Sequence, residues 1–434
     1  MRFLVSTSLA IVFSASIAHA QDPVASAMPG HQHHTATPAE PESPLGISHL
    51  RDGSGTSWLP DTSPMLGLMA ERGPWTLMLH GNTFLQAIGT RGERGDRQVG
   101  SINWIMPMAT RRVGGGPLEL RGMFSVEPLT VGRCGYPTLL GSGESCRGEA
   151  LHDRQHPHDL LMELAARYRR AIASGLAIEL YGGPAGEPAL GPTAFPHRLS
   201  AMPNPIAPVA HHWLDSTHIS FGVVTAGVYG HRWKAEGSAF NGREPDDERY
   251  DIDGGALDSY AARVWLMPTP RLVLQVSAGH LTDAEEHEDG TREDVRRITA
   301  SATWHTVKNG NTWAWTAAWG RNRERHHSTS AVLGEAALDL TAADTLFLRG
   351  EIVQKSADEL VLPLDAHDPF TLTKMQTGYT RWVHEGRGLK VGLGVSGAVS
   401  LLPAPLEPFY GSRRAAEGAV FLTVRPQGHG MAMP

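Results

Sequence analysis

The sequence lacks the features that mark several common classes of protein. Beyond residue 20 it contains no run of about 18 apolar residues, which excludes an ordinary helical membrane protein. Its formal net charge of −7 is mild and gives no basic footprint for nucleic acid. It contains no Gly-x-Ser-x-Gly elbow, phosphate-binding glycine loop or dinucleotide fingerprint. We therefore expect neither a nucleic-acid partner nor an enzyme.

Cysteine is scarce, with only Cys134 and Cys146 present. In an oxidising compartment, two cysteines separated by a short glycine-rich loop are expected to form a disulfide. A pair of free thiols is the alternative. Zinc ligation is disfavoured because the spacing is not that of a zinc knuckle.

Residues 1–20 have the pattern of a secretory signal peptide. Arg2 supplies the positive region, Leu4–Ile17 the apolar stretch, and Ala18–Ala20 the small-x-small cleavage pattern. We place the mature start at Gln21. The alternative is a membrane anchor, for which the apolar stretch is short.

Residues 21–74 are predicted to form an irregular periplasmic arm or a plug. The part up to about residue 42 is rich in proline, alanine and histidine and has no apolar period. The part that follows, up to Trp75, is also irregular.

From Trp75 onward, segments of alternating hydrophobicity dominate. In Leu389–Leu401, leucine and valine occupy one face, and glycine, serine, alanine and lysine the other. Such segments are long enough to cross a bilayer at a tilt, which takes roughly 9–11 residues. In a soluble sandwich the apolar face would point inward, whereas in a transmembrane barrel it faces lipid. Residues 159–170 also fit an amphipathic helix, but their alternation favours a strand.

The connections between these segments alternate between short turns, as at 227–230 and 308–311, and long polar loops, as at 241–256 and 282–294. Outer-membrane barrels have short periplasmic turns and long outside loops. We count about 16 strands, with 14 or 18 as alternatives. The prediction is an all-β, antiparallel transmembrane barrel over residues 75–425, with long extracellular loops, in lipid of the cell outer membrane. Six tryptophans are predicted to form its interface girdles: Trp233, Trp265, Trp304, Trp313, Trp319 and Trp382.

The same alternation directs charged side chains of both signs to the barrel interior. They are Glu163, Arg167, Arg169, Glu179, Lys234, Glu236, Arg263, Arg297, Glu335, Asp339, Arg349, Glu351, Lys374 and Lys390. An open pore and a plugged barrel both accommodate such residues.

Two long connections, at about 127–158 and 182–217, carry a concentration of candidate metal ligands. These are His152, His156 and His158 in the first loop and His197, His211, His212 and Asp215 in the second. Long loops of barrels fold inward or cap the mouth, so the two sets could meet. Imidazole and carboxylate groups suit Cu(II), zinc or nickel. The alternative is a structural network that holds the loops against the barrel wall.

The two ends of the mature chain carry histidine together with methionine, a combination that suits Cu(I) or Ag(I). The candidates are Met28, His31, His33 and His34 in the arm, and His429, Met431 and Met433 in the tail at 426–434. On the predicted topology both ends lie in the periplasm. The alternative is that these residues have no ligand role.

Three segments, at 152–168, 186–225 and 240–253, carry a family resemblance. The chain resembles a family of uncharacterised bacterial outer-membrane proteins grouped with heavy-metal and copper resistance systems, from about residue 51 onward. The resemblance implies a barrel, and periplasmic metal-resistance components as partners, but no ligand residues. In plan only, the chain is similar to copper-resistance outer-membrane proteins of another family, which pair a Met/His-rich arm with a barrel.

The leading hypothesis is therefore the binding of copper or another soft metal, or its passage across the outer membrane. The first alternative is a general or substrate-specific porin for small solutes, with structural histidines. The second is an outer-membrane hydrolase, because Asp215, Ser216 and His218 supply the residue types of a catalytic triad. Neighbours on a strand alternate faces, however, so closeness in sequence does not make a triad.

Overall fold

The computed structural model describes residues 43–286, 292–325, 327–364 and 368–427, all within the unit Glu40–Pro434. The predicted signal peptide and the candidate ligands of the arm and tail lie outside these residues. They are Met28, His31, His33, His34, His429, Met431 and Met433.

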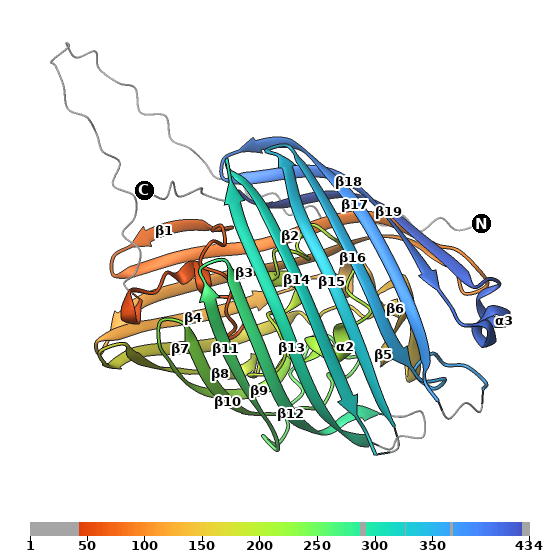
Figure 1. Cartoon of the computed structure of the whole chain (residues 1–434), viewed down its shortest axis with the longest axis horizontal. Coiled ribbons are helices and arrows are strands. Elements are labelled where there is room, and N and C mark those ends of the chain that lie inside the picture. Colours follow the sequence, from red (N-terminus) through yellow and green to blue (C-terminus); the bar gives the residue numbers. More distant parts are fainter. Residues whose placement is uncertain (1–42, 287–291, 326, 365–367, 428–434) are drawn as a thin grey trace, which may run out of the picture. The chain divides into compact units, whose positions relative to one another are not determined.

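Sixteen antiparallel strands form a closed wall (Figure 1), so the predicted fold class is confirmed. The strands are β2 (Trp75–Thr90), β3 (Arg97–Val113), β4 (Gly116–Phe124), β7 (Leu161–Ala173), β8 (Leu176–Gly186), β9 (Ser220–Tyr229), β10 (Trp233–Phe240), β11 (Ser259–Thr269), β12 (Leu272–Glu286), β13 (Arg292–Lys308), β14 (Asn311–Arg323), β15 (Ser328–Thr341), β16 (Asp344–Lys355), β17 (Phe370–Gly386), β18 (Leu389–Leu401) and β19 (Arg414–Pro426). Each pairs with the next, and β4 pairs directly with β7. The wall closes where β19 pairs with β2, with Leu422 opposite Leu85.

The remaining elements are short. β1 (Leu68–Arg72) pairs with the first residues of β2, and β5 (Tyr136–Cys146) pairs with β6 (Glu149–Gln155) in a separate hairpin. The helical turns are η1 (Pro44–Gly46), η2 (His49–Arg51), α1 (Glu127–Thr130), η3 (Phe195–His197), α2 (His211–Leu214), η4 (Ser216–His218), η5 (Ala404–Leu406) and α3 (Glu407–Tyr410). In the part of the chain that the structure describes, no helix is long and apolar enough to cross a membrane.

The wall carries its apolar side chains on the outside. In β18, Leu393 and Val395 are each about half exposed, whereas Ala398 and Ser400 are buried. Val395 lies opposite Val420 of β19, which is also exposed, so the apolar face continues from strand to strand. An apolar exterior of this kind is stable where lipid replaces water. The protein is located in the outer membrane.

Two predicted girdle tryptophans point the other way. Trp233, Trp313 and Trp319 are exposed, but Trp265 and Trp382 are buried. The Trp265 and Trp382 indoles donate hydrogen bonds to Glu236 and Thr345 inside the barrel, at 2.8 and 2.9 Å. Their assignment to the girdle was wrong because both residues fall on the inward parity of their strands, where the indole N–H finds a polar partner.

The interior of the barrel is filled at the level of the charged wall residues. Of the predicted interior charges, Asp339 and Lys390 are half-buried and the others are buried. Lys234, for example, is 0% exposed and lies 3.1 Å from Glu179 and 3.3 Å from Glu236. Polar wall residues are buried around the circumference: Gln86, Arg121, Arg167, Gln275, Thr316, Glu335, Lys374 and Thr423. In a wide aqueous pore these side chains would be in contact with water, so the barrel is plugged at this level.

Candidate functional site in the barrel lumen

Two segments between wall strands fold into the lumen and fill much of it. The first, residues 125–160 between β4 and β7, contains α1 and the β5–β6 hairpin; the second, residues 187–219 between β8 and β9, contains η3, α2 and η4. A disulfide joins Cys134 to Cys146 across the first segment, as predicted. We call them the first and second inner loops.

Apolar packing fixes both inner loops against the wall. Leu140 of the first loop and Trp213 of the second belong to one buried cluster with Leu333 of β15 and Val353 of β16. The Trp213 indole donates a 2.8 Å hydrogen bond to Thr329. Burial of a side chain of this size stabilises the loop by roughly 1.5–3 kcal/mol.

A glycine in the wall permits this close approach. A Cβ atom on Gly320 of β14 would lie 2.2 Å from the carbonyl oxygen of Trp213. That distance is far below van der Waals contact, so a larger residue would push the second loop away from the wall. The Trp-Gly sequence in β14 is therefore matched to the path of the second inner loop.

The inner loops bring five imidazoles together. These are His156 and His158 from the first loop and His211, His212 and His218 from the second. Ring centroids lie 5.1 Å apart for His211 and His218, 5.3 Å for His158 and His218, 5.5 Å for His211 and His212, and 6.0 Å for His156 and His212. We call this set the imidazole cluster. Sequence reasoning placed His218 just beyond the second loop and left it out of the ligand set.

Two predicted ligands are not part of the imidazole cluster. His152 has a side chain that is 40% exposed, and its Nδ1 lies 3.1 Å from Asp153. His197 instead packs against Trp104 of β3 and His80 of β2, with ring centroids 4.7 and 5.7 Å away. Sequence spacing grouped these residues because it could not show how each loop turns inside the lumen.

Asp215 orients the cluster and links it to the wall. Its carboxylate accepts hydrogen bonds from Nδ1 of His211, at 2.8 Å, and from Arg198, at 2.5 Å. Arg198 is fully buried and also donates to Glu335 of β15, at 2.7 Å. Burial alone would raise the pKa of Asp215, but Arg198 and His211 reverse this and hold the pKa below its usual range. Asp215 is therefore an anion that fixes the orientation of His211.

The proton on His218 can be assigned from its partner. Nδ1 of His218 lies 2.8 Å from the backbone carbonyl oxygen of Asp215, which can only accept a hydrogen bond. Burial, together with the neighbouring His211 and His158, holds the pKa of His218 well below its ordinary value, so the ring is neutral. Nε2 then carries a lone pair, and this buried atom has no hydrogen-bond partner.

The other imidazoles of the cluster differ in their hydrogen-bond partners and in the direction of their pKa shifts. Nε2 of His212 is likewise buried without a hydrogen-bond partner, and burial lowers the pKa of His211 and of His156. His158 differs, because its Nδ1 lies 3.0 Å from Glu127, and this carboxylate outweighs burial and raises the pKa of His158. The cluster thus combines neutral imidazoles with one that holds its proton more firmly.

Similarity to known proteins is confined to the fold. No family model and no curated protein matches the chain. Among solved structures, the OmpF complex with daunomycin from Salmonella typhi aligns with a TM-score of 0.52 and 10% identity, covering 82% of this chain and 100% of that chain. The chain has the fold of an outer-membrane porin.

Two further porin-type structures align less closely. The anion-selective porin from Comamonas acidovorans has a TM-score of 0.48 and 10% identity, covering 81% of this chain and 100% of its own. The outer-membrane channel DcaP of Acinetobacter baumannii has a TM-score of 0.47 and 9% identity, covering 83% and 99%.

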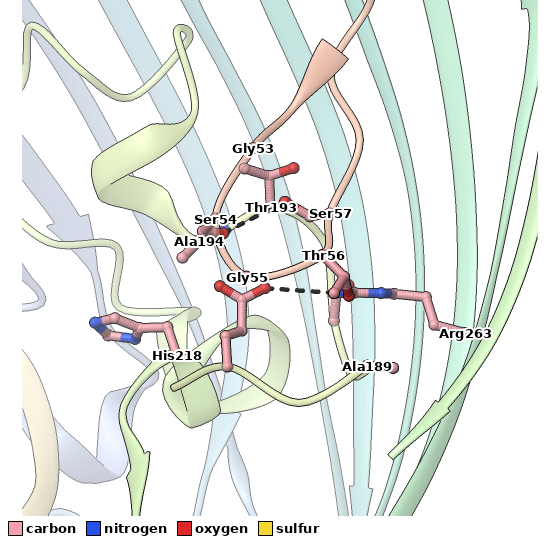
Figure 2. Close-up of polar contacts among 12 residues, drawn as sticks. Gly53, Ser54, Gly55, Thr56, Ser57, Ala189, Thr193, Ala194, His218 and Arg263 are labelled. Carbon is pink, nitrogen blue, oxygen red and sulfur yellow. Dashed lines mark hydrogen bonds and ion pairs between the residues drawn. The ribbon is translucent and has the colours of Figure 1, made fainter. Parts of the chain in front are cut away.

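The porin-fold barrel also holds its own N-terminal segment in the lumen. Figure 2 shows the turn Gly53–Ser57 against the second inner loop, where the backbone N–H of Ala194 donates a 2.9 Å hydrogen bond to Ser54. From the wall, Arg263 donates a 3.1 Å hydrogen bond to the Thr56 hydroxyl, and Lys234 donates to the Thr56 carbonyl oxygen. The turn therefore links the second inner loop to the barrel wall.

Asp215, Ser216 and His218 do not form a triad in this arrangement. The Asp215 carboxylate bonds to His211 rather than His218, and the Ser216 hydroxyl accepts a 2.9 Å hydrogen bond from Arg297. Nδ1 of His218 bonds to the backbone carbonyl of Asp215, so the Asp215 carboxylate does not orient this ring as a triad of these three residues would require.

The imidazole cluster offers at most two ring nitrogens to any one point in the described structure. Over the described ranges, no three of these imidazole nitrogens lie within 4.8 Å of one another. Asp246, Asp251 and Asp253 do meet that limit, but they are largely solvent-accessible carboxylates. The unpartnered Nε2 atoms of His212 and His218 are imidazole nitrogens, a ligand type that suits copper or zinc.

Proposed function

We propose that this barrel binds copper or a related soft metal through the imidazole cluster and so handles the metal at the outer membrane. The observation that carries the proposal is the pair of buried Nε2 atoms, on His212 and His218, that have no hydrogen-bond partner. A buried polar atom left unsatisfied costs roughly 1–3 kcal/mol, which a bound ion would offset. A purely structural histidine network would be expected to pair these atoms.

The surrounding residues support this role. Asp215 bonds to Nδ1 of His211, which leaves the opposite ring nitrogen available to a ligand. Carboxylates that hydrogen-bond to metal-binding histidines fix the ring and raise its basicity. Arg198 neutralises Asp215, so the site does not accumulate negative charge that would favour a hard cation.

We include the two ends of the chain in this proposal as collecting segments. Met28, His31, His33 and His34 of the arm and His429, Met431 and Met433 of the tail offer thioether and imidazole donors. Periplasmic metal-resistance components would be the natural partners of such segments.

The test is calorimetric titration of the detergent-refolded protein with Cu(I), Cu(II), Ag(I) and Zn(II). The variant His212→Gln/His218→Gln, which removes both unpartnered Nε2 atoms, should bind the preferred ion roughly 10–100-fold more weakly, the loss typical when a metal site is disturbed. His384→Gln, at an exposed position on β17, is the matched control. Substituting the arm and tail histidines by glutamine and the methionines by leucine, in both backgrounds, separates their contribution. Affinity equal to that of the control would refute the role of the cluster.

Passage of small solutes is the second candidate, favoured by the porin fold. Conductance of purified protein in planar bilayers distinguishes the two. The filled lumen predicts low conductance, whereas a large conductance without metal dependence would support a porin with structural histidines.

A further inference from the structure

A second group of soft donors lies in the lumen, away from the imidazole cluster. A cavity of about 100 Å³ is lined by six of the chain's 14 methionines: Met65, Met69, Met78, Met106, Met108 and Met202. Three histidines, His49, His80 and His197, line the same cavity. It lies beside the start of β2 and the end of β3, at the end of the barrel that has the short turns. In outer-membrane barrels this is the periplasmic end.

Strand register fixes the positions of the methionines. Met69 of β1 is opposite Met78 of β2, which in turn is opposite Met108 of β3, so the three form a row across adjacent strands. His80 and Met106 form the next pair along, on the same face. Directly opposite residues have Cβ atoms about 4.5–5.5 Å apart. The backbone of the wall therefore presents three or four thioethers and an imidazole to one small space.

The second inner loop covers this space. His197 packs edge-on to His80, and the backbone carbonyl of Met202 accepts a 3.0 Å hydrogen bond from Asn82. The Met202 sulfur already accepts a contact from Arg425, at 3.4 Å. The donors available to an ion are thus those of the wall, with Met202 at the edge of the site.

The charges around the cavity favour a soft ion rather than a hard one. Asp52 is paired with Arg167 and Arg169, and Arg121 lies 3.5 Å from Glu119. With the carboxylates engaged, the remaining donors are thioether sulfurs and imidazole nitrogens, among them Nε2 of His80, a buried atom without a hydrogen-bond partner. Thioether ligands select Cu(I) and chemically similar Ag(I) over Mg²⁺, Ca²⁺ or Zn²⁺.

We propose that this cavity is a Cu(I)- or Ag(I)-binding site formed by Met78, Met106 and Met108 with His80. It adds to the proposed function a second binding position, nearer the short-turn end than the imidazole cluster, but it rests on different residues. The competing explanation is that flexible methionines merely fill an irregular gap beside the plug, as they do in many cores.

The test uses Ag(I) as the probe, with methyl-¹³C-methionine NMR of the full-length refolded protein. Ag(I) should shift the methyl resonances of Met78, Met106 and Met108. The buried Met267 and the exposed Met375, which neither line the cavity nor belong to the cluster around Met106, should be unaffected. Unchanged resonances at the three wall methionines in saturating Ag(I) would overturn the proposal.

Affinity provides a second measurement. The variant Met78→Leu/Met106→Leu/Met108→Leu should lose at least roughly tenfold in Ag(I) affinity at this site, and His80→Gln should weaken it further. Leucine nearly conserves methionine volume, so the barrel should fold, and Met267→Leu/Met375→Leu, at positions outside the cavity and its neighbouring cluster, is the matched control. If both triple and control variants keep wild-type Ag(I) affinity, the methionines are packing residues.

The proposed metal sites, the imidazole cluster and the methionine cavity, can be tested independently of each other. His212→Gln/His218→Gln should leave the Ag(I)-dependent shifts at Met106 intact, whereas loss of those shifts would show that one site depends on the other. Conversely, if Ag(I) binds to the imidazole cluster but does not shift the methyl resonances of the wall methionines, only the inference about the methionine cavity is refuted.

Discussion

Replacing Arg198 by methionine should release the second inner loop from the barrel wall. Arg198 is 0% exposed and joins the loop residue Asp215 to the wall residue Glu335, at 2.5 and 2.7 Å. It also donates a 2.9 Å hydrogen bond to the backbone carbonyl of Thr193. Arg198→Met keeps much of the side-chain volume but removes every one of these contacts.

The expected loss of free energy holding the second inner loop to the wall depends on which carboxylate is left unpaired. Glu335 keeps Arg349, at 3.2 Å, and the Ser200 hydroxyl, at 2.9 Å. Asp215 keeps only His211 as a side-chain partner. Breaking a buried ion pair from one side costs about 3–5 kcal/mol, and we expect the lower end because one of the two carboxylates stays paired. About 3 kcal/mol corresponds to roughly a hundredfold increase in the released loop.

Limited proteolysis with thermolysin, mapped by mass spectrometry, measures this release directly. Cleavage within residues 187–219 should accelerate roughly a hundredfold if it tracks the open population, while the wall strands stay intact. Arg414→Met, at an exposed position, should cleave at the wild-type rate.

Two outcomes would refute the reasoning. The first is a change in cleavage of less than about threefold, which would mean that Arg198 does not hold the loop. The second is a double variant, Arg198→Met/Asp215→Asn, that opens as readily as Arg198→Met. Removing the stranded charge should recover much of the loss, because the uncompensated carboxylate is its cause.

Three other predictions concern single features of the two inner loops. Burial raises the pKa of Glu187 to about 7 from its ordinary value of 4.5. The free energy of unfolding should therefore fall by about 3 kcal/mol as the pH rises from the lower to the higher of these values. Glu187→Gln should remove that fall. If the unfolding free energies of the wild type and of this variant change equally with pH, the prediction is contradicted. Gly320→Ala should raise proteolysis at Trp213 because the new methyl group meets its carbonyl oxygen, whereas Gly334→Ala, with open space around its Cβ, should not. Reducing the disulfide between Cys134 and Cys146 should destabilise the first inner loop by up to about 3 kcal/mol, seen as faster cleavage there; an unchanged rate would mean that packing alone holds the loop.

The wall was predictable because strand alternation is a local property. In Leu389–Leu401 the identity of every second residue already separates the lipid face from the interior, and the structure places them so. The 159–170 segment was ambiguous between helix and strand, and pairing with β4 and β8 decides for β7. Trp265 and Trp382 were misplaced because both lie near strand ends, as girdle residues do, but occupy inward-facing positions of their strands.

The site was predictable only in its residue types. The sequence contained the histidines of both inner loops, but it could not show that His152 and His197 lie apart from the histidines that meet in the cluster. His80 and Met106 offered a signal that was not used, since both fall on inward positions of their strands. Their opposition depends on the register between β2 and β3, which sequence periodicity leaves open.

The sequence by itself determined a lipid-facing antiparallel barrel, the sign and position of its interior charges, and a pair of cysteines placed to form a disulfide. Each follows from interactions between residues close in the chain or from the period of two that a strand imposes. Only the tertiary structure decided that the lumen is filled by residues 43–67 and the two inner loops, and that five imidazoles and a row of methionines gather at different levels inside it. These contacts join residues far apart in the chain, and they depend on wall register, on the space left by Gly320, and on ion pairs such as Arg198 with Asp215.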